Sequence, residues 1–104
     1  MPNLLDQWHF MNTVMCDPTL TDLDRRLSFR MLDYYQAADG CGWSYHWRLA
    51  DELSVERESV SRSLRRLKTK GLFSISSPYG RRGRKYFKPN WGYVTEGSHG
   101  EEVH

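Results

Sequence analysis

Three successive stretches of the chain place apolar residues at helical spacing, and this repetition is the strongest constraint on the fold. The first stretch begins at Thr21, whose side-chain oxygen can cap a helix, and Gly40 is its predicted stop. The apolar stripe of this stretch consists of Leu23, Leu27, Met31, Tyr34 and Ala38. We therefore expect an amphipathic helix between Thr21 and Gly40.

The second and third stretches follow closely. Gly40-Cys41-Gly42 predicts a tight connection, after which Trp43 and Ser44 lead into a helix. The inward face of that helix is formed by Leu49, Ala50 and Leu53. After a turn at 54–56, a third helix begins at Arg57 and ends at Lys70-Gly71, with an inward stripe of Val60, Leu64 and Leu67.

The spacing changes from helical to alternating after Gly71. Residues 72–76 have the alternation of a strand, residues 77–84 form a glycine-punctuated turn, and residues 85–88 predict a returning strand. The expected fold class is therefore mainly α with a small β-hairpin whose tip is cationic.

The two ends of the chain are less defined. Leu4, Trp8, Met11 and Met15 fit a helical stripe, whereas Trp8, Phe10 and Val14 also suit an extended segment, so both interpretations stay open. We expect an N-terminal extension over 1–19, a domain over 20–90, and a flexible tail over 91–104, where residues 95–104 carry three acids and few aliphatic side chains.

Charge is distributed very unevenly along the 104 residues, although the net charge is only +2. Residues 57–88 hold eleven Lys or Arg against the single acid Glu58, whereas residues 1–56 hold four against nine. Residues 89–104 hold three acids and no Lys or Arg. Concentrated positive charge of this kind is expected where a polyanion docks on one surface.

Size and composition exclude several classes. A chain of 104 residues fits one small domain. No apolar run exceeds three residues, far short of the about 20 that cross a bilayer, and the start lacks a secretory pattern. Cys16 and Cys41 have no metal-binding or redox spacing, so we expect reduced thiols and a cytoplasmic protein without membrane association.

Catalysis has no support in the sequence. The histidines share no metal-ligand spacing with each other or with the cysteines; they are His9, His46, His99 and His104. The segment 80–85 is rich in glycine and arginine but lacks the spacing of a phosphate-binding loop. We expect no enzyme activity, no metal or cofactor, and no small-molecule substrate.

The run Leu49-Ala50-x-x-Leu53-x-Val55, continued by Val60, Leu64, Leu67 and Gly71-Leu72, resembles the core signature of winged helix-turn-helix domains in bacterial regulators of the GntR and MarR type. Trp43 and the preceding Gly40-Cys41-Gly42 are similar to small phage and plasmid domains of this class. The resemblance covers roughly residues 20–88. It implies a three-helix core with a two-stranded wing, a recognition helix in the major groove of double-stranded DNA, and a basic wing at the minor groove.

The resemblance also assigns contacts. The start of the third helix would read bases through Arg57, Ser59, Ser61 and Arg62, with Arg62 or Arg57 reading guanine. Glu58 could accept from a cytosine amino group or hold Arg62, and we favour the second role. Further positions are expected at phosphates or in the minor groove: Tyr45, His46, Arg65, Arg66, Lys68, Lys70, Arg81, Arg82, Arg84 and Lys85.

Some residues depart from the family pattern. Glu56 and Tyr45 stand where such domains place small hydroxyl caps, and we expect Ser44 to cap the second helix and Glu56 to act through the helix dipole. Trp47 replaces a polar residue. It could touch DNA, form a partner interface or pack on the N-terminal segment, and we favour packing.

The expected function is transcriptional repression in a mobile-element or phage-type system, in the bacterial nucleoid, with two copies of the chain on a repeated or palindromic site. One alternative is a DNA-architectural factor in plasmid replication initiation or in excision and recombination. A hypothesis of another class is a protein- or RNA-interaction module that uses exposed tryptophans: Trp8, Trp43, Trp47 and Trp91.

Overall fold

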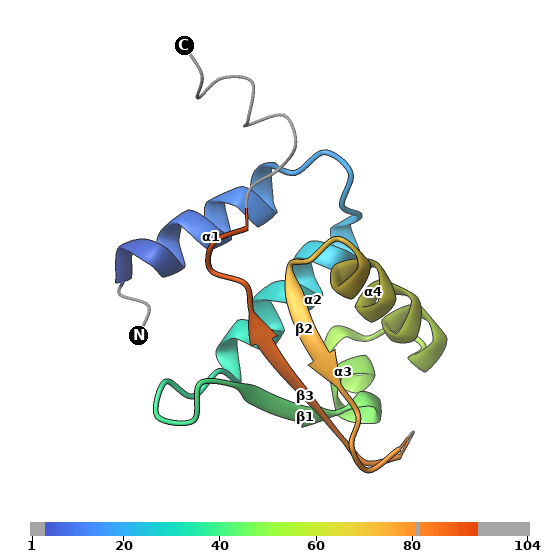
Figure 1. Cartoon of the computed structure of the whole chain (residues 1–104). Helices are drawn as coiled ribbons and strands as arrows, with labels where there is room; N and C mark the ends of the chain where they lie inside the picture. The colour runs from blue at the N-terminus through green and yellow to red at the C-terminus, as the bar shows by residue number, and fades with distance from the viewer. Residues whose placement is uncertain (1–3, 81, 94–104) are drawn as a thin grey trace.

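The computed structural model describes residues 4–80 and 82–93, which form four helices and a three-stranded antiparallel sheet (Figure 1). The elements are α1 (Leu4–Cys16), α2 (Asp22–Asp33), β1 (Gly42–Tyr45), α3 (His46–Leu53), α4 (Arg57–Thr69), β2 (Phe73–Ser76) and β3 (Arg84–Pro89). This part of the chain is therefore mixed α/β. It contains one strand more than the sequence predicts, and a helix, α1, in the segment for which the sequence left helix and strand open.

Helix α2 begins as predicted but ends early. The Thr21 hydroxyl accepts from the Asp24 amide at 3.1 Å, and the Asp24 carboxylate accepts from the Thr21 amide at 3.1 Å, which makes a complete capping box. The prediction that the helix continues to Gly40 is wrong. The chain turns back after Tyr34, and Ala38 is exposed in the turn rather than part of the apolar face.

Strand β1 replaces the predicted connection before the second helix. It pairs with β3, so that Gly42 lies opposite Phe87, and β3 occupies the centre of the sheet between β1 and β2. A Cβ atom on Gly42 would lie 2.7 Å from the carbonyl oxygen of Tyr34, so only glycine lets the strand approach the end of α2 this closely. The predicted two-stranded hairpin is confirmed as β2 and β3, with a third strand added.

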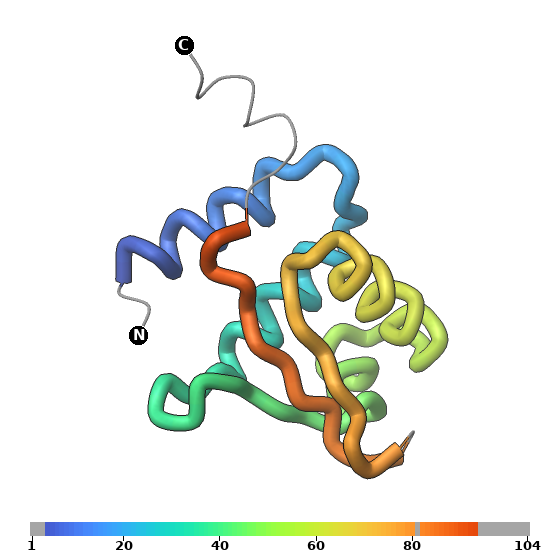
Figure 2. The backbone as a smooth tube through the Cα atoms, in the orientation of Figure 1, coloured from blue at the N-terminus to red at the C-terminus, as the bar shows by residue number. Residues whose placement is uncertain are grey.

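Helices α3 and α4 are confirmed, and a tight turn joins them (Figure 2). Ser54 closes α3 in the left-handed conformation, at φ 57° and ψ 45°. Ser44 lies in β1, and Tyr45 precedes α3 without a side-chain capping bond, so the prediction that Ser44 caps this helix is wrong. Helix α4 ends at Thr69 with Lys70 as its C-cap, and Gly71 follows with φ 82°.

The core lies between the helices and one face of the sheet. The predicted inward residues of α3 and α4 are buried, together with Leu27 and Met31 of α2 and Phe73 and Phe87 of the sheet. Helix α1 adds Phe10 and Val14, which are 1% and 0% exposed. Of the two structures that the sequence left open for the N-terminal segment, helix and extended strand, the helix is therefore the one observed. Residues 4–16 pack into the domain rather than forming an extension.

The predicted C-terminal boundary at residue 90 is also wrong. Trp91 packs edge-on against Phe10 of α1 and Tyr35, with ring centroids 5.4 and 5.3 Å apart, and the Tyr93 hydroxyl donates to Asp17. The remaining tail, 94–104, lies outside the described residues. Within the described residues, every helix is too short or too polar to cross a bilayer.

Candidate nucleic-acid interface

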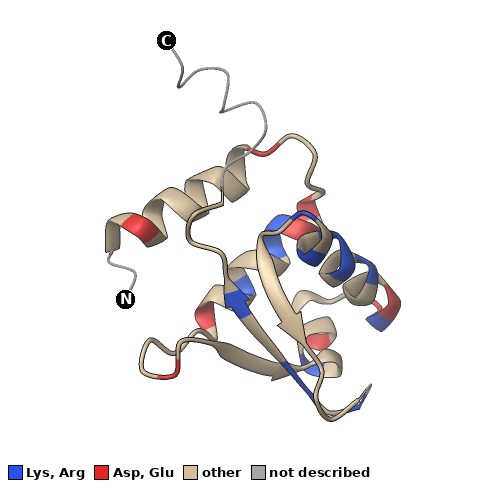
Figure 3. Cartoon of the chain, in the orientation of Figure 1, with Lys and Arg blue, Asp and Glu red and all other residues tan. Residues whose placement is uncertain are grey.

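A groove of about 650 Å³ separates the exposed side of α4 from the β2–β3 hairpin. In the described part of the chain five basic side chains line it: Arg57, Arg65 and Lys68 from α4, and Arg82 and Lys85 from the hairpin. Figure 3 shows Lys and Arg concentrated along α4 and at the start of β3, next to the hairpin turn. Two elements that follow each other in sequence thus point their positive charge into one groove.

The helical repeat and the strand alternation explain why these side chains meet. On α4 the groove residues Arg57, Ser61 and Lys68 lie along one side of the helix, next to the stripe that packs into the core. On β3 Lys85 shares a face of the sheet with the buried Phe87, and that face is the one covered by α4. Core packing therefore fixes the width of the groove.

Arg84 lies on the other face of the sheet. Its guanidinium sits over the ring of Trp43 in β1, with Cζ 4.2 Å from the ring centroid. Consecutive strand residues point to opposite faces, so Arg84 turns away from the groove that Lys85 enters. Arg84 therefore does not line the groove, and it makes a cation–π contact within its own chain.

Arg66 is also engaged inside the molecule. Its Nη2 and Nε donate to the fully buried carboxylate of Asp24, at 2.8 Å to Oδ1 and 3.0 Å to Oδ2, and Ser63 donates to the same group. Lys70, expected at a phosphate, instead lies 3.6 Å from Asp17. Both cations hold α4 to the segment that leads into and starts α2.

His46 ties the start of α3 to the start of α4. Its Nε2 lies 2.7 Å from the carbonyl oxygen of Arg57 and 3.2 Å from the Ser61 hydroxyl. Because a carbonyl oxygen only accepts, Nε2 carries a proton and donates to it. His46 therefore lines the groove and also positions Arg57 within it.

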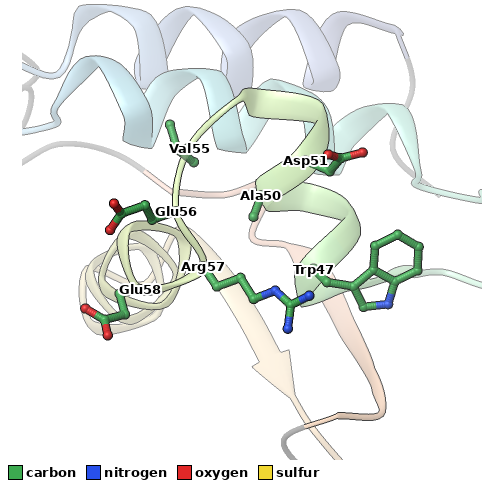
Figure 4. A pocket seen from close by; sticks show the side chains of 7 residues that line it. All are labelled: Trp47, Ala50, Asp51, Val55, Glu56, Arg57 and Glu58. Atoms are coloured by element: carbon green, nitrogen blue, oxygen red, sulfur yellow. The ribbon is translucent and has the colours of Figure 1, made fainter.

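A second cavity of about 620 Å³ lies between the beginnings of α3 and α4, where Trp47, Arg57 and Glu58 line it (Figure 4). Trp47 stacks on Tyr45, with centroids 5.9 Å apart and planes 16° apart, and stays 49% exposed. The prediction that Trp47 packs on the N-terminal segment is therefore wrong. Tyr45 belongs to this aromatic cluster on the outer side of the sheet, not to the groove.

Three further predicted contact residues do not line the groove or lie outside the residues that the structure describes. Arg62 is exposed on α4, and the described residues show no ion pair between it and Glu58, contrary to the holding role expected for that acid. Ser59 is half-buried near the start of α4, and it does not line the groove. Arg81 lies outside the described residues.

Half of the predicted contact residues line the groove: His46, Arg57, Ser61, Arg65, Lys68, Arg82 and Lys85. Ser77 lines it too, although the sequence marks it only as part of a turn. Its hydroxyl accepts from the Lys85 ammonium at 3.0 Å. A predicted register of the two hairpin strands would have placed Ser77 opposite Lys85 and so could have identified it.

Comparison with known proteins adds no identification. No protein-family model matches this sequence, and comparison with curated proteins found no match.

Proposed function

We propose that this chain is a winged helix-turn-helix protein that binds double-stranded DNA. In this interpretation α3 and α4 are the helix-turn-helix, α4 is the recognition helix, and the hairpin of β2 and β3 is the wing. The observation that carries the proposal is the groove in which Arg57, Arg65 and Lys68 face Arg82 and Lys85. Basic side chains on two elements that flank one groove suit a phosphate backbone that runs between them.

The dimensions of the interface also fit DNA. A helix about 10–12 Å in diameter enters the major groove, and residues near its N-terminus meet the base edges. Arg57 and Arg62 lie in the first two turns of α4, and neither has an ion-pair partner in the described part of the chain. Their guanidinium groups therefore remain available to guanine, while Arg65 and Lys68 follow toward the phosphates.

The proposed role is transcriptional regulation by occupancy, as a repressor in a mobile-element or phage-type system. This part rests on the resemblance of the core signature to bacterial regulators. A domain this small would act most simply by covering a promoter.

Fluorescence anisotropy with a labelled duplex of arbitrary sequence tests DNA binding directly. At about 50 mM salt, where phosphate contacts are strong, the protein should bind, and its affinity should fall steeply as salt rises. Arg65→Ala and Lys68→Ala should each weaken binding and reduce the salt slope by about 0.9 for each phosphate that is no longer neutralised.

Arg30→Ala is the matched control. It removes one positive charge from α2, where Arg30 pairs with Asp33 outside the groove. This variant should bind nearly as the parent does. Absence of duplex binding at low salt, or an equal loss of affinity in Arg30→Ala and Arg65→Ala, would contradict the proposal.

A further inference from the structure

Helix α1 exposes a stripe of large apolar side chains that the described chain does not cover. Leu4, Trp8, Met11 and Met15 are 81%, 64%, 37% and 53% exposed, and Leu5 beside them is 60% exposed. Scattered apolar residues on a surface are ordinary, but a contiguous set on one helix marks a contact surface.

The spacing of the stripe identifies the shape of its partner. Leu4, Trp8, Met11 and Met15 are separated by four, three and four residues, which is the alternation of a seam between two packed helices. Phe10 and Val14 lie on a different side of α1 and are buried against the rest of the domain. The helix therefore has one apolar side for its own core and another for a second helix.

From these observations we infer that the chain forms a homodimer in which α1 of one copy packs against α1 of the other. A symmetric dimer buries the same patch on both copies, so each stripe supplies the partner that the other requires. Asp6 is the only formally charged residue of α1, so two copies meet with little like-charge repulsion.

The C-terminal segment of the same chain is poorly suited to cover the apolar stripe of α1. Residues 94–104 contain Val94 and Val103 as their only aliphatic side chains, together with three glutamates, and cannot supply an apolar surface comparable to the stripe. The position of α1 favours self-association as well. It lies at the end of the molecule opposite the hairpin turn, so pairing through α1 leaves the basic groove of each copy open (Figure 1).

Sedimentation equilibrium of the full chain without DNA tests the inference. The parent should be dimeric at micromolar concentrations, and Trp8→Glu should weaken association by at least about 30-fold, since a central tryptophan commonly dominates an interface. Met15→Glu, at another exposed position of the stripe, should act in the same direction. Circular dichroism establishes that each variant is folded.

His9→Glu is the matched control, because it adds the same charge to the next residue of α1 but points away from the stripe. It should remain dimeric. A full chain that stays monomeric overturns the inference and leaves the face to residues 94–104 or to a different protein. A dimer that both Trp8→Glu and Met15→Glu leave intact overturns it too.

The inference does not depend on the proposed DNA binding, and the variants separate the two. Trp8→Glu should bind a duplex with a single site as the parent monomer would, because the groove is untouched. Arg65→Ala should still dimerise although its DNA affinity falls. Loss of dimerisation in Arg65→Ala would place the interface at the groove and contradict the assignment to α1.

Discussion

Arg66 on α4 forms a two-pronged ion pair with Asp24, whose carboxylate is completely buried at the start of α2. The same carboxylate accepts from the Thr21 amide and from the Ser63 hydroxyl. One acid thus caps α2 and fixes the position of α4 relative to it. Since α4 forms one wall of the basic groove, this buried contact supports the geometry of the proposed DNA-binding surface.

Asp24→Asn should lower the free energy of unfolding by about 2–3 kcal/mol, somewhat less than removal of one partner from a fully buried pair, because the Arg66 side chain is 41% exposed and regains water. Urea unfolding followed by circular dichroism measures the loss. Asp33→Asn serves as control, because its ion pair with Arg30 lies at the surface and should contribute at most about 0.5 kcal/mol. Equal losses in the two variants would refute the structural role of Asp24.

Stability should fall in acid in a window set by Asp24 and Asp17. Burial alone raises the pKa of Asp24, but hydrogen bonds from Arg66, Ser63 and Thr21 outweigh it, so the net pKa lies below the ordinary 3.8. For Asp17 burial is likewise outweighed, by hydrogen bonds from Thr19, and its pKa is also lowered. A lowered folded-state pKa stabilises the protein fully above the unfolded-state value and progressively less as pH falls through the folded-state value.

Urea titrations at a series of pH values below 5 check this dependence. The free energy of unfolding should decrease as pH drops below about 3.8, with Asp24→Asn showing a flatter profile than the parent. Asp33→Asn should keep the parental profile. If the slope of Asp24→Asn matched that of the parent, Asp24 would not be a source of the acid sensitivity.

Gly42→Ala should destabilise the fold by about 1–3 kcal/mol, the usual cost of overpacking. The added methyl group would lie 2.7 Å from the Tyr34 carbonyl oxygen and 2.8 Å from Cε1 of Phe87, and a backbone carbonyl cannot easily move aside. Gly92→Ala is the control, since its nearest neighbour would lie at an ordinary 3.8 Å. Thermal unfolding should separate the two, and a Gly42→Ala protein as stable as Gly92→Ala would show that β1 can shift without cost.

Arg62→Ala and Arg82→Ala should weaken DNA binding in different ways. If Arg62 reads a base, its removal should relax the preference at one position of the selected site by about 1–3 kcal/mol. Arg82 lines the groove from the hairpin, so its removal should lower affinity for all sequences and reduce the salt slope. Selection from a random duplex library, followed by anisotropy on the selected and a scrambled duplex, measures both. Sequence-neutral losses of the same size in the two variants would mean that Arg62 is not the reader.

The sequence predicted correctly those features that depend only on residues close together in the chain. The cap at Thr21, the stripe of Val60 and Leu64, and the alternation of the hairpin strands all appear in the structure. Each depends on neighbours within a few residues, so the sequence is sufficient to indicate it. Arg65 and Arg82 were both predicted as contact residues, but the packing of α4 on the sheet decided that they line one groove.

The remaining features depend on partners far away in the chain. Strand β1 has four residues and no strong alternation of its own, and it exists because β3, about forty residues later, offers a free edge. Arg66 and Arg62 look alike in sequence, yet only Arg66 lies beside Asp24. The sequence by itself determined which faces are apolar and where positive charge is concentrated. Tertiary packing decided which cations are paired within the molecule, because a buried carboxylate needs a charged partner and pairs with the guanidinium that packing places beside it.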